Sequence, residues 1–142
     1  MKFNYFKMPV PPSEAHPTHK WYKRPIIQID LVYNSNRLKT YALIDSGADW
    51  CVFQGVLGKA LSINLESGKK QLIRGITADP IVAYFHDISI SIGGWDFSCY
   101  VGFSDGLNTL PYGILGQNGF FSKYVIIFDY QKETIELKDP KK

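Results

Sequence analysis

Hydrophobic and polar residues alternate with a period of two through residues 27–31 and 88–92, which is the pattern of β-strands that bury one face. The pair Gly93-Gly94 follows the second run and predicts a tight turn into a returning strand at 95–103. Helical periodicity is scarce, and residues 55–62 allow one short helix at most. The pattern therefore predicts an all-β chain.

Further strands are predicted from continuous apolar runs, which are typical of strands buried on both faces. These strands are 37–44, 112–115, 124–130 and, less apolar, 134–138. Residues 70–76 and residues 81–85 are predicted to form two strands joined by a polar turn, as in a hairpin. Most of the chain is thus accounted for by strands and turns.

An aspartate stands directly after the apolar end of strand 37–44, in the run Leu43-Ile44-Asp45-Ser46-Gly47-Ala48. Burial disfavours a charged carboxylate unless polar partners stabilise it. An acid at this point therefore suggests a functional role for the aspartate. Glycine permits a tight turn whose amides face the carboxylate, and the serine hydroxyl can donate or accept a hydrogen bond beside it. Asp-Ser-Gly is also an ordinary turn sequence. Taken alone, the tripeptide favours a turn over an active site.

A second segment far downstream shifts that balance. It runs Tyr112-Gly113-Ile114-Leu115-Gly116-Gln117 and leads from an apolar strand into a polar turn. Together the two segments resemble the retropepsin family, the single-domain aspartic proteases related to retroviral proteases. That family has a hydrophobic-hydrophobic-Asp-Thr/Ser-Gly-Ala signature, then a flap hairpin, then an Ile-Leu-Gly segment that opens a short helix. The resemblance covers residues 25–138, which it identifies as an aspartic protease domain.

The resemblance implies an all-β fold, a closed β-barrel of the acid-protease type with a flap hairpin and one short C-terminal helix at about residues 120–123. It also implies an aspartic endopeptidase that hydrolyses extended peptides with a water molecule activated by two carboxylates. The chain holds a single Asp-Ser-Gly. The second carboxylate must therefore come from another copy, and activity requires a symmetric homodimer. Peptide or protein substrates, and neither cofactor nor metal, follow from the same resemblance.

The family's roles carry over to matching positions of this chain. Asp45 is expected to be the catalytic carboxylate. The active-site loop is expected to comprise Ser46, which bonds across the dimer axis, with Gly47, Ala48 and Asp49, the last of which contacts the substrate backbone. The flap that closes over substrate is expected at Ile73, Arg74, Gly75, Ile76, Thr77, Ala78, Asp79, Pro80 and Ile81. The downstream structural motif is Ile114, Leu115 and Gly116.

One departure from the family pattern follows this motif. Retroviral members place an arginine after Ile-Leu-Gly, where it pairs with the acid that corresponds to Asp49. Here Gln117 stands instead, and a neutral amide forms no ion pair. The flap also carries Pro80, which fixes φ and stiffens closure.

Two other interpretations stay open at the level of sequence. A retropepsin fold can act as a peptide-binding or dimerisation module that cuts weakly or not at all, with Asp45 as a structural turn residue. The chain can also be an unrelated small β-barrel, which leaves Ile114-Leu115-Gly116 and the flap-like hairpin unexplained. Two Asp45 carboxylates within hydrogen-bonding distance favour the protease, whereas a stable monomer favours the binding module.

The two ends of the chain fall outside the resemblance. Residues 1–24 hold four prolines and are expected to form an extended arm without regular structure, and residues 139–142 form a small basic tail. His16 and His19 lie three apart in the arm with no third ligand near them, so exposed side chains are favoured over a metal site.

Composition adds the remaining bounds. A chain of 142 residues with 45% hydrophobic and 15% aromatic residues suits one folded domain and not a disordered one. A net charge of +3 with scattered lysines and arginines gives no nucleic-acid footprint. Cys51 and Cys99 lack a Cys-x-x-Cys spacing and are predicted to be buried free thiols. No segment approaches the ~20 apolar residues of a membrane span, and no signal peptide is visible, so a cytoplasmic location is the default expectation.

Overall fold

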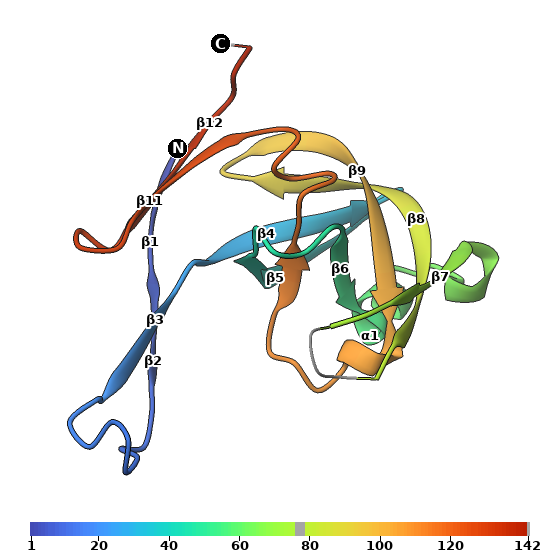
Figure 1. Cartoon of the computed structure of the whole chain (residues 1–142). Helices are drawn as coiled ribbons and strands as arrows, with labels where there is room; N and C mark the ends of the chain where they lie inside the picture. Colours follow the sequence, from blue (N-terminus) through green and yellow to red (C-terminus); the bar gives the residue numbers. More distant parts are fainter. Residues whose placement is uncertain (76–78, 142) are drawn as a thin grey trace.

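The computed structural model describes residues 1–75 and 79–141. Its centre is a closed barrel of six strands (Figure 1). The order around the barrel is β4 (Ile26–Tyr33), β5 (Asn36–Ile44), β10 (Gly113–Leu115), β6 (Cys51–Gln54), β9 (Trp95–Ser104) and β8 (Ile81–Ile92), and β8 closes the ring by pairing with β4. Strand β7 (Lys69–Ile73) pairs with β8 outside the ring. The all-β barrel predicted from the sequence is confirmed.

The barrel is filled by the apolar positions that alternate along its strands. Ile29 and Leu31 of β4 and Ile90 and Ile92 of β8 are at most 2% exposed. Among the largest fully buried side chains are the phenylalanines Phe53, Phe103 and Phe120. Burying such a side chain contributes roughly 1.5–3 kcal/mol, so this period-two pattern stabilises the closed ring.

Within the described ranges the helical content is small. The only α-helix is α1 (Gly55–Ala60), where the sequence allowed one, and two 3₁₀ turns follow it at η1 (Leu65–Ser67) and η2 (Asp105–Leu107). No helix in this part of the chain is long and apolar enough to cross a membrane.

The prediction of a short helix after Ile114-Leu115-Gly116 is wrong, because this segment forms a series of turns. Gly119 adopts a φ of +113°, which interrupts right-handed helical geometry. The amides of Phe121 and Ser122 bond the carbonyls five residues back, and only Tyr124 bonds the carbonyl four residues back. A regular ladder of helical hydrogen bonds therefore does not develop.

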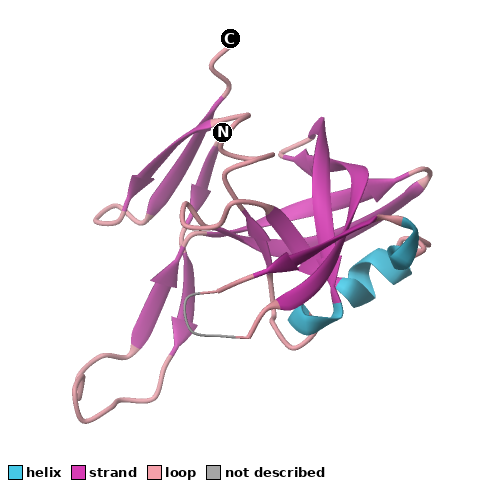
Figure 2. Ribbon diagram, turned by 45° about the vertical axis from the view of Figure 1, so that its right-hand side comes forward, coloured by secondary structure: helices cyan, strands magenta, loops and turns pink. Residues whose placement is uncertain are grey.

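A second, three-stranded sheet joins the two ends of the chain outside the barrel (Figure 2). Its order is β1 (Lys2–Asn4), β12 (Thr134–Lys138) and β11 (Val125–Asp129), all antiparallel. Ile135 and Leu137 of β12 are buried in the core, but Val125, Ile127 and Phe128 of β11 are at least 40% exposed. The expected buried strand at 124–130 is thus wrong in its burial, because β11 is the outer edge of this small sheet.

The first 24 residues also differ from expectation, because they contain regular structure. Besides β1 they form a two-stranded hairpin of β2 (Phe6–Pro9) and β3 (Trp21–Arg24). The prolines fall at the end of β2 and in the connecting loop, where the absence of an N–H group costs no ladder hydrogen bond. The prediction of an arm without regular structure is therefore wrong. The prolines indicate the loop between two strands.

Candidate active site

The two sequence motifs lie side by side in the barrel. Strands β5 and β10 are parallel, with Leu43 opposite Ile114 and Ile44 opposite Leu115. The Asp45 amide then donates to the Leu115 carbonyl at 3.0 Å, so the aspartate leaves its strand directly beside Gly116. Segments about 70 residues apart in sequence thus meet at the predicted catalytic residue.

The Asp45 side chain is held by its own turn. The Gly47 amide donates to Asp45 Oδ1 at 2.9 Å, and the Ala48 amide donates to the Asp45 carbonyl at 3.2 Å. Asp45 is half-buried, whereas Ser46, Gly47 and Asp49 are exposed. One carboxylate oxygen is therefore oriented by the backbone, and the turn presents the group at the surface of the barrel.

The residues after Ile114-Leu115-Gly116 fasten the active-site loop through backbone carbonyls. Gln117 donates from its backbone amide to Ala48 at 2.8 Å and from its side-chain amide to the Ser46 carbonyl. Asn118 donates from its backbone and side-chain amides to the Asp49 carbonyl at 2.9 and 3.0 Å. Four hydrogen bonds from two residues thus fix a loop of exposed residues.

Gly116 makes this close approach sterically feasible. A Cβ atom there would lie 2.7 Å from the Ala48 carbonyl oxygen and closer still to that of Trp50. A backbone carbonyl has little freedom to move aside, so only glycine allows the two segments to touch at this point. The glycine of the downstream motif thus has a packing role at the site.

The position that holds an arginine in the retropepsin pattern is occupied by Gln117 in this chain. Gln117 supports the loop through neutral hydrogen bonds and not through an ion pair. Among residues 1–75 and 79–141, the Asp49 carboxylate has no hydrogen-bond or ion-pair partner.

An apolar cluster separate from the main core lies against this loop. Val52, Ala83 and Phe85 are buried in it, and four partly buried side chains pack around them, namely Trp50, Ile73, Leu107 and Ile114. Trp50 meets Phe85 edge to face, with ring centroids 6.0 Å apart. The cluster combines Trp50, which follows the loop residue Asp49, with the motif residue Ile114 and with Ile73 at the base of the predicted flap.

Strands β7 and β8 form the hairpin predicted from the sequence, with Ile73 opposite Ile81. Ile73 packs in the apolar cluster, and Ile81 lies beside Gly106 of η2. Of the residues between them, Arg74, Gly75, Asp79 and Pro80 are exposed. The predicted flap residues Ile76, Thr77 and Ala78 lie outside the described residues.

Two thiols lie beneath the loop, both free and buried as predicted. The Gly116 amide donates to Cys51 Sγ at 3.4 Å. A hydrogen bond with Cys99 lowers the pKa of Cys51, and the same bond together with burial raises the pKa of Cys99. No group of three metal-ligating side chains occurs in the part of the chain that the structure describes. Both thiols belong to the main hydrophobic core.

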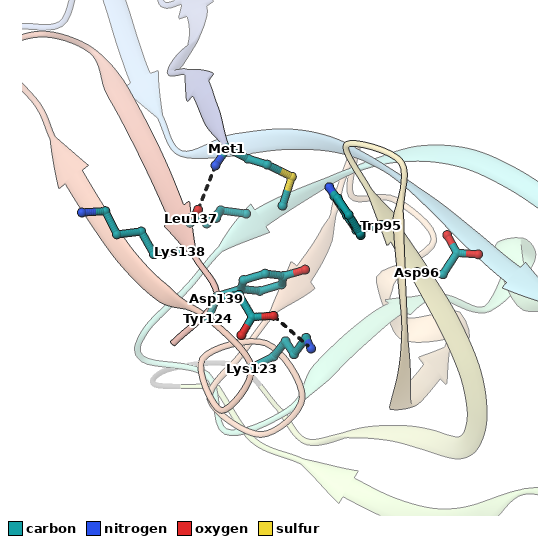
Figure 3. Close-up of a pocket in the computed structure, with 8 residues that line it drawn as sticks. All are labelled: Met1, Trp95, Asp96, Lys123, Tyr124, Leu137, Lys138 and Asp139. Atoms are coloured by element: carbon teal, nitrogen blue, oxygen red, sulfur yellow. Dashed lines mark hydrogen bonds and ion pairs between the residues drawn. The ribbon is translucent and has the colours of Figure 1, made fainter. Parts of the chain in front are cut away.

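A cavity of about 550 Å³ lies away from the predicted site (Figure 3). It opens between the start of β9, which contributes Trp95, and the terminal sheet, which contributes Leu137 and Lys138. An ion pair of 3.6 Å between Lys123 and Asp139 lies on its wall. None of the predicted site residues lines it.

Neither a family model nor a curated protein matches this chain.

The sequence pointed to most of the residues that meet here, but it missed the part played by Gln117 and Asn118. Gln117 was noted only as a departure from an arginine, and Asn118 was not singled out. Their position directly after Ile-Leu-Gly was the one available signal.

Proposed function

We propose that this protein is a homodimeric aspartic endopeptidase of the retropepsin type, with one Asp45 from each subunit in a shared active site. The observation that carries the proposal is the parallel pairing of β5 with β10, which sets Asp45 beside Gly116 and lets Gln117 and Asn118 fasten its loop. A catalytic group needs such a rigid support, since small displacements cost much of the rate.

The reaction requires two carboxylates with different proton occupancy. The ionised Asp45 takes a proton from water, which attacks the scissile carbonyl carbon, while the protonated Asp45 of the other subunit donates a hydrogen bond to the carbonyl oxygen. The tetrahedral intermediate then collapses, and the amine leaves with a proton from the dyad. Because one member must hold a proton, activity is expected to be highest at mildly acidic pH.

Substrate binding draws on the surfaces around the loop. An extended peptide binds as an added strand, with main-chain hydrogen bonds for affinity and side-chain pockets for selectivity. The apolar cluster with Trp50 and Ile114 supports a preference for apolar side chains near the scissile bond. The β7–β8 hairpin is the element proposed to close over the peptide and exclude water.

The second subunit is required because the chain supplies a single Asp-Ser-Gly. The open edge of β11 supports association, since no strand pairs with its outer side among the described residues. An unpaired strand edge with exposed apolar side chains is a template for pairing with another chain. Val125, Ile127 and Phe128 give β11 this character.

The first prediction concerns Asp45→Asn. This substitution keeps the size and the Gly47 hydrogen bond but removes the titratable carboxyl, so peptidase activity is expected to fall by ~10³-fold or more. Cleavage of a peptide library at pH 4–7 measures the activity, and sedimentation measures the dimer, which is expected to remain. Asp87→Asn, an exposed aspartate of β8, is the matched control.

Two results would contradict the proposal. Full activity in Asp45→Asn would remove the aspartate from the mechanism. A wild-type dimer that binds peptides without cleaving them at any pH would instead identify a peptide-binding module.

A further inference from the structure

The two cysteines of the chain point to the same side of the barrel wall, beneath the active-site loop. Cys51 begins β6, which runs parallel to β9 with Cys51 opposite Val101. Cys99 lies two residues before Val101 on β9, so the side chains of Cys99 and Cys51 share one face of the sheet. Both are packed in the main core, with Cys51 0% and Cys99 4% exposed. The sequence contains no other cysteine.

The backbone at Gly119 lies against both sulfur atoms. A Cβ atom at this glycine would lie 2.7 Å from Cys99 Sγ and 3.2 Å from Cys51 Sγ. A side chain there would therefore collide with the pair, and the φ of +113° also favours glycine. A hydrogen bond joins the two thiols. The thiols are thus direct neighbours in a space that glycine leaves open.

Cys51 also holds the backbone that supports the active-site loop. The Gly116 amide donates to Cys51 Sγ at 3.4 Å, and the Cys51 thiol donates to the Asn118 carbonyl at 3.7 Å. Gly116 and Asn118 flank Gln117, whose side-chain amide reaches the Ser46 carbonyl. A shift of the Cys51 sulfur therefore acts on both neighbours of the residue that fastens the loop.

The two thiols differ in their readiness to ionise. The hydrogen bond from Cys99 lowers the pKa of Cys51, whereas the same bond and burial raise the pKa of Cys99. The thiolate is the form of cysteine that reacts with oxidants, so Cys51 is the group that reacts first and Cys99 the thiol that follows. Because both are buried, only a small oxidant that enters during local opening of the turns at 117–123 reaches them.

We propose that Cys51 and Cys99 form a reversible disulfide when hydrogen peroxide oxidises them, and that this bond lowers the activity of the site above them. The proposal concerns the regulation of the active site and rests on the proposed function. It uses side chains that the proposed peptide hydrolysis does not involve.

The chemistry takes two steps. One peroxide oxygen is transferred to the Cys51 sulfur as the O–O bond breaks, which gives a sulfenic acid and one water molecule. The Cys99 sulfur then attacks the Cys51 sulfur, the S–O bond breaks, and the hydroxyl leaves as water with the proton of the Cys99 thiol. Two thiols are oxidised, one peroxide is reduced, and one disulfide and two water molecules result. A dithiol reductant reverses the reaction by exchange.

Bond formation moves the Cys51 sulfur towards Cys99 and away from the Gly116 amide. A buried N–H group without an acceptor is unfavourable, so the segment at Gly116 has to move as well. The Asp45 amide donates to the carbonyl of Leu115, directly before Gly116, so the movement reaches the catalytic loop. Peptidase activity is expected to fall roughly tenfold or more, because small displacements of a catalytic group cost much of the rate.

The experiment treats the full chain with hydrogen peroxide and then with dithiothreitol. Intact mass after alkylation in denaturant counts the free thiols, and peptide mapping identifies a Cys51–Cys99 bond. Cys99→Ala and Cys99→Ser form no such bond and no longer lower the pKa of Cys51, so both variants should stay active in peroxide. Met8→Leu is the matched control, since peroxide also oxidises methionine, and it should lose and regain activity as the wild type does. Circular dichroism checks that each variant is folded.

The amide NMR shifts of Gly116 and Asn118 give a readout that does not depend on catalysis. They are expected to change on oxidation of the wild type and to return with dithiothreitol. Four results would each overturn the switch: thiols that stay free in excess peroxide, disulfides that join two chains in place of Cys51 with Cys99, a Cys51–Cys99 bond that leaves activity and these shifts unchanged, or equal losses of activity in Cys99→Ala and wild type.

The same measurements separate this proposal from the proposed function. A reduced protein that cleaves no peptide at any pH contradicts the enzyme, while the mapped bond and the Gly116 shift still decide whether the pair is a switch. An active reduced protein whose thiols resist peroxide contradicts the switch and leaves the enzyme.

Discussion

At the scale of single residues, Gln117 supports the loop after Asp45 through neutral hydrogen bonds. Its amide reaches the Ser46 carbonyl, one residue from Asp45, while its backbone reaches Ala48. An ion pair across the same gap would also neutralise Asp49, whose carboxylate has no partner among residues 1–75 and 79–141. The loop is thus positioned by hydrogen bonds to its backbone carbonyls.

The prediction at this scale is for Gln117→Ala. Losing the bond to Ser46 is expected to lower the free energy of unfolding by roughly 0.5–1.5 kcal/mol. In the proposed enzyme, kcat should fall severalfold with KM little changed, because the loop position is disturbed while the apolar cluster around Trp50 stays intact. Denaturant titration and steady-state kinetics measure the two effects.

Gln28→Ala is the control, since Gln28 is exposed on β4 and its side chain makes no described hydrogen bond. An unchanged kcat beside a reduced stability would assign Gln117 a structural role only.

At the scale of elements, the hairpin of β2 and β3, called the arm hairpin, is joined to the β11–β12 turn by Glu133, which pairs with both Lys7 and Lys23. Hydrogen bonds from Lys23 and Lys7 lower the pKa of Glu133, and the Glu133 partner raises the pKa of Lys23. Because the pKa of Glu133 is lowered, its ion pairs stabilise the docked hairpin at pH values above 4.5, the ordinary pKa of glutamate. This contribution is lost as the pH falls through the lowered pKa. Because the pKa of Lys23 is raised, its ion pair also stabilises the docked hairpin at pH values below 10.5, the ordinary pKa of lysine. This contribution is lost as the pH rises through the raised pKa.

Docking of the arm hairpin is therefore expected to be constant from about pH 5 to 10 and to weaken beyond either limit. Amide NMR shifts of β2 and β3 over a pH series measure this. Glu133→Gln should remove the acidic transition from these shifts while leaving the barrel signals unchanged, and an acidic transition that persists in this variant would refute the role of Glu133.

At the scale of the whole molecule, the barrel presents only half of the proposed chemistry. Asp45 lies at the surface of the barrel, and hydrogen bonds within the chain fasten its loop. In the proposed homodimer, association would bring two such preformed halves together without reorganising them. Such preorganisation limits the free energy that dimerisation must supply.

A mixing experiment tests whether the two halves share one site. Wild-type chains exchanged with an equal amount of Asp45→Asn chains form mixed dimers, in which only one carboxylate is present. Statistical exchange leaves about half of the wild-type chains paired with each other, so activity per wild-type chain should fall to about half. Activity that stays constant on mixing would mean that each subunit works alone.

Much of this architecture was predictable from the chain itself, and the failures have specific causes. The alternation at 27–31 and 88–92 and the glycine turn at Gly93-Gly94 describe strands that fold as expected. Apolar content alone could not tell the interior of the barrel from the edge of a small outer sheet, so the burial of β11 was mispredicted. The arm was mispredicted because its prolines indicated irregular structure throughout, whereas most of them belong to a loop between two strands.

The sequence alone determined most strands of the barrel, the turn at Gly93-Gly94, and which acid stands after an apolar strand, because these depend on local conformational preference and side-chain periodicity. The tertiary structure alone decided that β5 and β10 pair in parallel, that Gln117 reaches Ser46, and that Val125, Ile127 and Phe128 of β11 are exposed. Those outcomes depend on contacts between residues far apart in the chain. Their energies are set by which edges and faces meet when the barrel closes.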